Sequence, residues 1–385
     1  MIDGFKDIKL PHQKLNILFI LRAPIGGLFR HVLDLAIELE NRGHKAGMVI
    51  DGSNEYTQAK EWRKQMEQNF KLGIHTLPMS RSLGLSDFSN PFALNKLAHS
   101  LEIDVLHGQG AKGGFFARLA RPKNSVAFYT PHGGVLNYDP KSMAGKIFRK
   151  IEALLMSRTD AIVFESGYAK DQYLFQIGKP KFPAPVVHNG LLEEEFLPLK
   201  KSIKTSDFAF IGELRSVKGI DYLIDALVDL KNSKGQKATL VIAGDGPLKE
   251  SIKEQVKSLG LQSRVELLGV RSAREVLAMG RCLVIPSLKE SLPYVLLEAA
   301  AANVPIITTN VGGIAEIFGP SADSLIEPAN SEILKNAMSE FLSDEKKARE
   351  LAKIRFEYVQ KNFSVKKMVN EIEALYYSSL KKIDA

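Results

Sequence analysis

Two cations and a glycine follow an apolar run in the second half of the chain. Arg215 and Lys218 stand three residues apart after residues 208–212, and Gly219 comes next, before a helical pattern. Positive charge is unfavourable at the N-terminus of a helix unless an anion neutralises it, because that end of the helix dipole is itself positive. The spacing therefore favours a phosphate site, although two solvated surface cations would give the same sequence.

Two carboxylates lie further along the chain. Glu290 follows the apolar run 282–287, and Glu298 comes after seven intervening residues in a stretch that is otherwise apolar. We expect Glu298 to be buried, and a buried carboxylate requires hydrogen-bond donors. The pair could flank one ligand in a cleft between two domains. The alternative is a loop glutamate and a helix glutamate that both reach solvent.

Paired glycines stand at the ends of several other apolar runs. They are Gly26 with Gly27, Gly244 with Gly246, and Gly312 with Gly313. Each pair precedes a helical pattern, where exposed backbone N–H groups can hold anions or hydroxyls. A tight structural turn explains residues 244–246 equally well.

His132 lies in a loop after the apolar run 126–130. A loop histidine is usually a surface residue. Its position at the end of a predicted strand favours a ligand contact instead.

Residues 108–113 contain the pattern Gly-x-Gly-x-x-Gly, which is the spacing of a dinucleotide-binding turn. Such a turn normally follows the first strand, and an acidic residue follows about twenty residues later at a strand end. Here the turn follows a later strand, and the next acidic residue is Asp139. We therefore disfavour an NAD-dependent oxidoreductase and interpret these glycines as a turn that ends a buried strand.

Short β-branched runs alternate with amphipathic stretches in both halves of the chain, which is the pattern of parallel α/β sheets. The predicted strands are residues 15–21, 44–51, 103–107, 126–130, 160–166 and 184–190 in the first half, and 208–212, 238–244, 264–269, 282–287 and 304–309 in the second. The polar segment 193–207 is predicted to be a linker. We predict two doubly wound, Rossmann-like α/β domains, residues 1–192 and 208–363, with ligands bound after the strands.

Composition limits the class of protein. The 385 residues carry a net charge of +8 and a single cysteine, Cys282. One cysteine excludes a disulfide framework, and the apolar stretch 15–21 is too short for a membrane span or a typical signal peptide, so we expect a cytoplasmic protein. The charge suits phosphorylated ligands or an anionic membrane. Without zinc-type spacing or an RNA-binding aromatic motif, we expect no nucleic-acid partner.

Residues 145–158 form an amphipathic, basic pattern. The apolar face contains Ile147, Phe148, Ile151, Leu154 and Leu155, and the cations are Lys146, Arg149 and Lys150. This helix could lie on the inner face of an anionic membrane and reach a lipid-linked acceptor. Packing of its apolar face on the protein's own sheet is the favoured alternative.

From about residue 15 to the final helix, these motifs resemble the retaining GT-B glycosyltransferases of glycosyltransferase family 4. The most specific element is the pair Glu290 and Glu298, and the segments "GELRSVKG", "AGDGP" and "NVGGIAE" occur in the family's order and spacing. The resemblance implies a GT-B fold, in which two Rossmann-like domains face each other across a cleft. It also implies that the last helix, about residues 364–385, crosses back to the first domain.

The resemblance implies roles for the charged residues. Arg215 and Lys218 match cations that hold the diphosphate of a nucleotide sugar, and Glu298 matches a residue that binds the ribose. Glu290 and His132 match residues beside the transferred sugar. Catalysis is therefore expected to rest on Glu290, His132, Arg215 and Lys218.

The resemblance also implies backbone contacts to the donor. Gly27 matches a turn near the phosphates, and Val270 falls where the base is seated. Gly244, Leu292 and Gly312 lie in loops expected to face the donor. Pro293 has no N–H group where such contacts to the sugar are common, which leaves the sugar open.

The implied reaction moves a sugar from a UDP- or GDP-sugar to a glycan or lipid-linked acceptor, in the synthesis of a surface polysaccharide or lipopolysaccharide. The sequence has no Asp-x-Asp motif, so we expect neither a metal nor a cofactor besides the donor. A nucleotide-sugar epimerase of the same fold and a non-catalytic nucleotide-sugar-binding protein are the alternatives.

Overall fold

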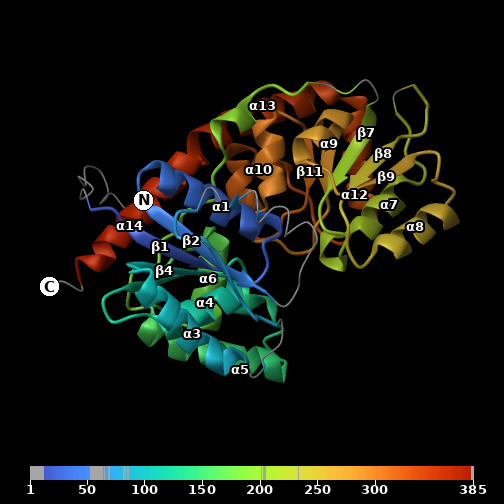
Figure 1. The fold of residues 1–385 in the computed structure, drawn as a ribbon. Coiled ribbons are helices and arrows are strands. Elements are labelled where there is room, and N and C mark those ends of the chain that lie inside the picture. The colour runs from blue at the N-terminus through green and yellow to red at the C-terminus, as the bar shows by residue number, and fades with distance from the viewer. Residues whose placement is uncertain are drawn as a thin grey trace. The chain divides into compact units, whose positions relative to one another are not determined.

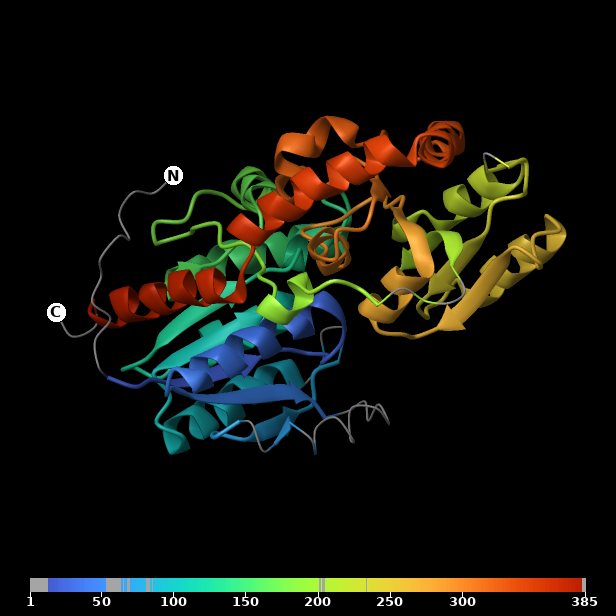
Figure 2. The same cartoon turned by 90° about the horizontal axis from the view of Figure 1, so that it is seen from above.

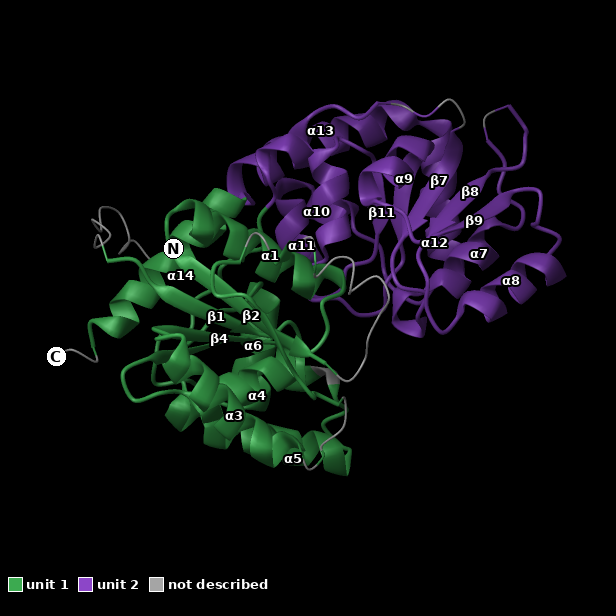
Figure 3. Cartoon of the chain, viewed as in Figure 1, with its two compact units in different colours: residues 1–190, 365–385 green, residues 191–364 purple. Residues whose placement is uncertain are grey.

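The chain divides into two compact units, each built around its own sheet (Figure 3). Unit 1 comprises residues 1–190 and 365–385, and unit 2 comprises residues 191–364. The computed structural model describes residues 13–52, 64, 66–67, 70–80, 84, 86–200, 202, 205–232 and 234–382. The segment predicted as a linker contains the 3₁₀ helix η3 (Glu193–Phe196), and the first strand of unit 2 begins inside it at Ser206.

Unit 1 contains a six-stranded sheet in the order β3-β2-β1-β4-β5-β6 (Figure 1). The strands are β1 (Asn16–Ile20), β2 (Lys45–Asp51), β3 (Ile74–Leu77), β4 (Val105–Gln109), β5 (Val126–Thr130) and β6 (Ala161–Ile162). All neighbouring strands pair in parallel. A parallel sheet is covered on both faces, which explains why its strands are apolar almost throughout.

Helices cover both faces of this sheet. They are α1 (Gly26–Asn41), α3 (Ser86–Ser100), α4 (Gly110–Ala120), α5 (Met143–Leu155), α6 (Gly167–Gln176) and α14 (Val365–Leu380). Alternate residues of a strand point to opposite faces. Ile17 and Phe19 therefore pack with α1 and α14, whereas Leu18 and Ile20 pack with α3 and α4. The last helix, α14, drawn in red in Figure 2, packs against α1 and is part of this core.

A buried ion pair joins three helices of unit 1. Arg118 on α4 donates two hydrogen bonds of 2.7 and 2.8 Å to Glu152 on α5. The hydroxyl of Tyr173 on α6 donates to the same carboxylate at 2.9 Å. All three side chains are buried. Each charge thus keeps a partner where water is excluded.

The structure corrects three expectations for unit 1. The predicted strand 160–166 is a strand only over Ala161–Ile162, and residues 184–190 form a single parallel bridge from Val186 to Phe164. Pro183 and Pro185 accept hydrogen bonds from the sheet through their carbonyl groups, but proline has no N–H to donate back. The short strand β3 was not predicted, because the sequence of residues 74–77 mixes polar and apolar residues.

Unit 2 contains a five-stranded parallel sheet in the order β11-β10-β7-β8-β9. The strands are β7 (Ser206–Ile211), β8 (Leu240–Ala243), β9 (Val265–Gly269), β10 (Gly280–Ile285) and β11 (Ile306–Thr308). The helices are α7 (Ile220–Leu227), α8 (Lys249–Ser258), α9 (Ala273–Met279), α10 (Tyr294–Ala301), α11 (Ile314–Phe318), α12 (Ser331–Ser343) and α13 (Glu345–Asn362).

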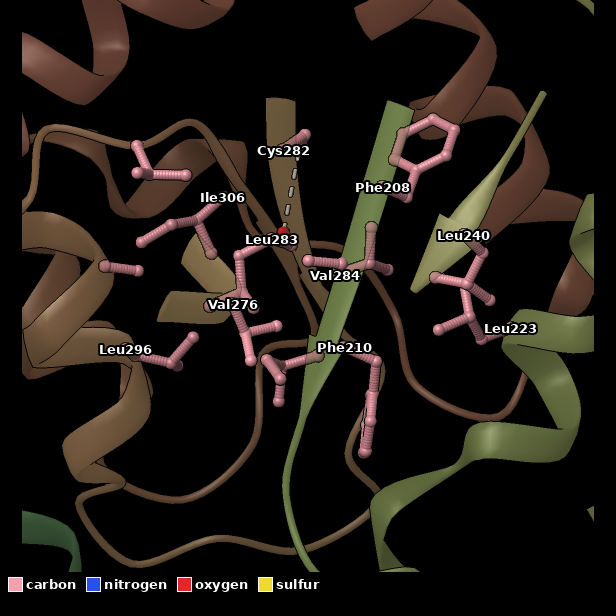
Figure 4. Packing of buried hydrophobic residues seen from close by; sticks show 14 of the residues in the cluster. Phe208, Phe210, Leu223, Leu240, Val276, Cys282, Leu283, Val284, Leu296 and Ile306 are labelled. Carbon is pink, nitrogen blue, oxygen red and sulfur yellow. Dashed lines mark hydrogen bonds between the residues drawn. The ribbon is translucent and has the colours of Figure 1, made fainter. Parts of the chain in front are cut away.

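The core of unit 2 lies along its central strands (Figure 4). Phe208 and Phe210 on β7 pack in one cluster with Leu283 on β10 and Leu296 on α10. Cys282 is buried in the same cluster, where burial raises the pKa of its thiol. A thiol in this setting is unreactive, because the thiolate is the reactive form.

We expect Glu152→Gln to lower the free energy of unfolding by about 3 kcal/mol, because the charge of Arg118 would stay buried without its carboxylate. Urea denaturation followed by circular dichroism measures the change. Glu38→Gln is the control, since it breaks a partly exposed ion pair between Glu38 and Arg42 on the same unit. That change should cost less than about 1 kcal/mol. Equal losses in the two variants would contradict the importance of the buried pair.

Candidate active site

The strand order of unit 2 reverses between β7 and β10. From β7 the chain continues through β8 and β9 on one side, and it then returns to β10 and β11 on the other. Open parallel sheets bind ligands at such a switch point, outside the C-terminal ends of the strands. Lys218 lies after β7, at the end of the 3₁₀ helix η4 (Ser216–Lys218), and Glu290 lies in the loop after β10. The two sides of the switch point therefore supply a cation and a carboxylate.

Lys218 and Glu290 are in direct contact. Lys218 Nζ donates to Glu290 Oε1 at 2.6 Å, and Ser287 Oγ donates to the same oxygen at 2.6 Å. The Glu290 side chain is 9% exposed and that of Lys218 is 22% exposed. Because both bonds end on Oε1, the second oxygen of Glu290 can accept a hydrogen bond from a ligand.

Backbone contacts hold three neighbouring loops of this site together. Leu288 N donates to Val217 O at 2.8 Å, which joins the loop after β10 to the loop after β7. Gly313 N donates to Ser291 O at 2.7 Å, which joins the loop after β11 to the loop after β10. Gly312 has a φ of +62°, and a Cβ atom there would lie 2.0 Å from Glu290 O. A side chain at 312 would therefore displace the loop that carries Glu290.

The other residues predicted to hold the donor diphosphate and base also follow strands of unit 2. Arg215 is the N-cap residue before η4, is about half exposed and pairs with Glu213 at 3.1 Å. Gly244 follows β8 and donates its N–H to Gly269 O at 2.8 Å. Val270 follows β9, and 63% of its surface is exposed. All three positions lie at the edge of the sheet that carries Lys218.

The structure corrects one expectation around α10. Glu298 is half-buried rather than buried, because the apolar residues of α10 do not enclose its whole circumference. Leu292 is 5% exposed and belongs to the core of unit 2. The contact predicted between Leu292 and a donor can therefore use only its backbone, as expected for this loop.

Unit 1 has a switch point of its own between β1 and β4. After β1, Gly27 lies in the first turn of α1, and after β4 the chain turns at Gln109. His132 follows β5 with a φ of +47°, and its Nε2 contacts Gln109 Oε1 at 2.8 Å. The structure thus brings the predicted histidine to the edge of the sheet where ligands bind.

Sequence reasoning missed one residue of this cluster, His31. His31 lies on α1, and its Nδ1 contacts Asn189 Oδ1 at 3.0 Å. The centroids of the His31 and His132 rings are 5.0 Å apart, in an edge-to-face arrangement. In the sequence, His31 fits the buried face of a predicted helix. Nothing in the sequence therefore distinguishes it from a residue that only packs in the core.

Both histidines are neutral at physiological pH. Burial lowers the pKa of His31 to about 3, against the opposing charge of Glu165 and the hydrogen bond to Asn189. Burial likewise lowers the pKa of His132 to about 3. They are therefore suited to hydrogen bonding and not to carrying positive charge.

The glycine pattern at 108–113 has a packing role. A Cβ atom on Gly108 would lie 2.3 Å from Gly113 O, and one on Gly113 would lie 2.0 Å from Ile20 O. These glycines let α4 approach β1 and β4 closely. The pattern is therefore explained without a dinucleotide.

Comparisons with known proteins give the family. The profile described as Glycosyltransferase Family 4 matches residues 25–194, and that described as Glycosyl transferases group 1 matches residues 193–357. An uncharacterized glycosyltransferase from Methanocaldococcus jannaschii is 30% identical over 315 residues, which cover 79% of this chain and 84% of that protein. The chain belongs to glycosyltransferase family 4.

Two further proteins are similar to this glycosyltransferase. The phosphatidylinositol N-acetylglucosaminyltransferase gpi3 subunit of Schizosaccharomyces pombe is 25% identical, over 83% of this chain and 70% of that one. The crystal structure of Anabaena HepE in complex with UDP and glucose superposes with a TM-score of 0.77 at 19% identity, covering 94% of this chain and 100% of HepE. The GT-B fold predicted for the glycosyltransferase is confirmed.

We expect Gly312→Ala to lower turnover of the glycosyltransferase by about 100-fold, because a shift of the Glu290 loop by roughly 1 Å has an effect of this order on catalysis. Nucleotide release from the donor measures it. Gly260→Ala is the matched control: its φ is +66°, but a Cβ atom there meets nothing within 4 Å. The role assigned to Gly312 fails if the two variants keep equal activity.

Proposed function

We propose that this glycosyltransferase moves a hexose or N-acetylhexosamine from a UDP- or GDP-sugar to a glycan or lipid-linked acceptor, with retention of the anomeric configuration and without a metal ion. The contact between Lys218 and Glu290 at the switch point of unit 2 carries the proposal. It places a fixed cation next to a carboxylate where ligands of parallel sheets bind.

The chemistry requires such a cation. When the bond between the anomeric carbon and the phosphate oxygen breaks, its electron pair goes to the diphosphate, which gains negative charge. An ammonium group has three donors, so the bond from Lys218 to Glu290 leaves others for a phosphate oxygen. Fixed positive groups stabilise the developing charge without reorganisation, and the exposed guanidinium of Arg215 adds a second one. Lys218 and Arg215 thus supply the positive charge that a metal ion supplies in metal-dependent glycosyltransferases.

Glu290 suits the sugar side of the reaction. Its Oε1 is held by Lys218 and Ser287, so the carboxylate has a fixed orientation before any ligand binds. The other oxygen can accept a hydrogen bond from a sugar hydroxyl. For retention we propose attack on the same face that the leaving group departs from. The acceptor oxygen bonds to the anomeric carbon, and its proton passes to the leaving phosphate oxygen. A product of inverted configuration would overturn this part of the proposal.

The similar proteins guide the choice of donor and acceptor. The name of the yeast relative describes transfer of N-acetylglucosamine to phosphatidylinositol, and the HepE structure holds UDP. UDP-sugars and lipid-linked acceptors are therefore the first to test. Synthesis of a surface polysaccharide or lipopolysaccharide is the process we infer.

We expect Lys218→Ala to lower turnover with the best donor by about 100- to 1,000-fold, because it removes one charge from the leaving group. UDP-, GDP- and ADP-sugars are first screened by thermal stabilisation, and nucleotide release is then measured with and without EDTA. Lys253→Ala is the control: that lysine pairs with Glu250 at 2.7 Å, but on the exposed surface of α8.

Three outcomes would overturn parts of this proposal. Near-normal turnover in Lys218→Ala would remove the phosphate site, and loss of activity in EDTA would remove metal independence. Conversion of the sugar without net nucleotide release in the presence of acceptor would instead favour an epimerase.

Helix α5 supports a peripheral contact with an anionic membrane. Met143, Ile147 and Leu154 are 72%, 46% and 74% exposed. Their spacing places them on one stripe of the helix, and the exposed Lys146 and Lys150 lie along one side of that stripe. The predicted apolar face is therefore split, since Leu155 packs inside unit 1. Within the described residues, no helix is long and apolar enough to cross a bilayer.

Arg149 differs from the other cations of α5. It donates to Tyr138 O at 2.9 Å, to Gly145 O at 3.0 Å and to the side chain of Gln176. These bonds fix it within unit 1. Only Lys146 and Lys150 are therefore assigned to the membrane.

We expect the double variant Lys146→Gln, Lys150→Gln to bind vesicles containing phosphatidylglycerol several-fold less than the wild type, because each lysine near the surface contributes about 1 kcal/mol. Co-sedimentation measures binding, and vesicles of phosphatidylcholine alone are the neutral reference. Lys123→Gln with Lys181→Gln removes the same charge from two other exposed positions of unit 1. Equal binding by the two double variants would exclude α5 as the membrane surface.

A further inference from the structure

Arg22 is a half-buried cation at the switch point of unit 1. It follows the end of β1, and its carbonyl accepts a hydrogen bond of 3.0 Å from the N–H group of Asp51, the last residue of β2. The strand order reverses between β1 and β4, so this is the edge of the sheet where ligands bind. Within the described residues, the guanidinium of Arg22 makes neither a hydrogen bond nor an ion pair.

The other cations at the beginnings of α1 and α4 are already paired. Lys112 on α4 contacts both carboxylate oxygens of Asp87 at 2.6 Å. Arg30 on α1 lies 3.4 Å from Asp34. Neither helix has an acidic side chain in its first turn. Arg22 is thus left as the cation at this edge that the described residues do not neutralise.

Packing brings the beginnings of α1 and α4 close to Arg22. A Cβ atom on Gly110, the first residue of α4, would lie 3.1 Å from Leu28 Cδ1 on α1. A Cβ atom on Gly113 would lie 3.4 Å from the Cα atom of Leu21, the neighbour of Arg22. The N-terminus of a helix carries partial positive charge. The two helices therefore add to the positive potential around Arg22 and do not offset it.

This setting suits an anion. The planar guanidinium of an arginine can donate two parallel hydrogen bonds to the oxygens of a phosphate or a carboxylate, and it carries its charge at every physiological pH. A cation that is partly removed from water is stabilised when an opposite charge neutralises it. A neutral glycan has no such charge, whereas a lipid that is joined to its sugar through phosphate has one.

We propose that Arg22 binds the phosphate of the acceptor, and that this glycosyltransferase therefore acts on a lipid-linked acceptor that carries phosphate and not on a neutral glycan. The inference rests on the proposed function, which assigns unit 1 to the acceptor. Lys218 and Arg215 of unit 2 remain the cations for the donor diphosphate. The donor diphosphate has the same chemistry as an acceptor phosphate, so the experiment must separate these two sources.

The test measures binding to the full-length protein without any reaction. UDP, inorganic phosphate, octyl glucoside, dihexanoyl phosphatidylinositol and geranyl diphosphate are titrated by calorimetry, and the last three are measured with UDP present. We expect Arg22→Ala to weaken binding of at least one of the two phosphate-bearing lipids by about 10- to 100-fold, because hydrogen bonds between charged groups are lost. The affinities for UDP and octyl glucoside should not change.

Two further variants separate charge from geometry and from general effects. Arg22→Lys keeps the charge but loses the planar fork, so binding of the same lipid should fall by only about 3- to 10-fold. Arg158→Ala is the matched control, because Arg158 also makes no ion pair among the described residues. It lies in the 3₁₀ helix η2 (Met156–Arg158) before β6, at the opposite edge of the sheet. This variant should bind every probe as the wild type does, and all three should keep the wild-type melting temperature.

Several results would overturn the proposal. Loss of UDP affinity with unchanged lipid binding would assign Arg22 to the donor. Equal losses for octyl glucoside and the phosphate-bearing lipids would show that the charge is not recognised. Binding of inorganic phosphate alone would show an adventitious ion only, and binding of neither phosphate-bearing lipid by the wild type would remove the assigned ligand. Failure of UDP to bind the wild type would instead count against the proposed function.

Discussion

The close approach of three loops at the ends of β7, β10 and β11 is the constraint on which the candidate site of unit 2 depends. Lys218 and Glu290 are separated by 72 residues in sequence and by 2.6 Å in space. The strand order brings them together, because it places β10 next to β7. That order requires a parallel sheet with a core on both faces, and the approach of the loops requires a residue without Cβ at Gly312. The hydrogen bond between Lys218 and Glu290 therefore depends on the packing of the sheet, on its strand order and on Gly312.

The two units use the same topological rule with different chemistry. Each sheet reverses its strand order once, and each gathers polar side chains at that reversal. Unit 2 gathers charges, with Lys218 and Glu290 in contact and Arg215 at the surface. Unit 1 gathers neutral groups, because burial keeps the pKa values of His31 and His132 near 3. Under the proposed function, the charged groups of unit 2 hold the donor diphosphate, whereas unit 1 presents neutral groups beside Arg22 at its switch point.

The sequence predicted most strands and most candidate residues, and the exceptions have identifiable physical causes. Apolar runs and glycines located nearly all strands, because burial on both faces leaves a continuous apolar signal. The failures are local: prolines break the strand expected at 184–190, and the apolar neighbours of Glu298 do not bury it. The motifs could not predict the contact between Lys218 and Glu290, because it depends on the register of two strands far apart in sequence. His31 was missed because a histidine on the buried side of a helix has the same pattern whether it supports a core or a ligand.

The last helix shows why the site of unit 1 cannot be understood from residues 1–190 alone. Tyr376 on α14 contacts His107 Nδ1 at 2.7 Å, and His107 Nε2 contacts Thr130 Oγ1 at 2.8 Å. A neutral imidazole needs one donor and one acceptor, and the two hydroxyls supply them. His107 lies two residues before Gln109, and Thr130 lies two residues before His132. A helix that follows unit 2 in the chain therefore satisfies the buried polar groups at the ends of β4 and β5. The strand ends that carry Gln109 and His132 are thus packed and satisfied in part by α14, so unit 1 is complete only when residues 365–380 have joined residues 1–190.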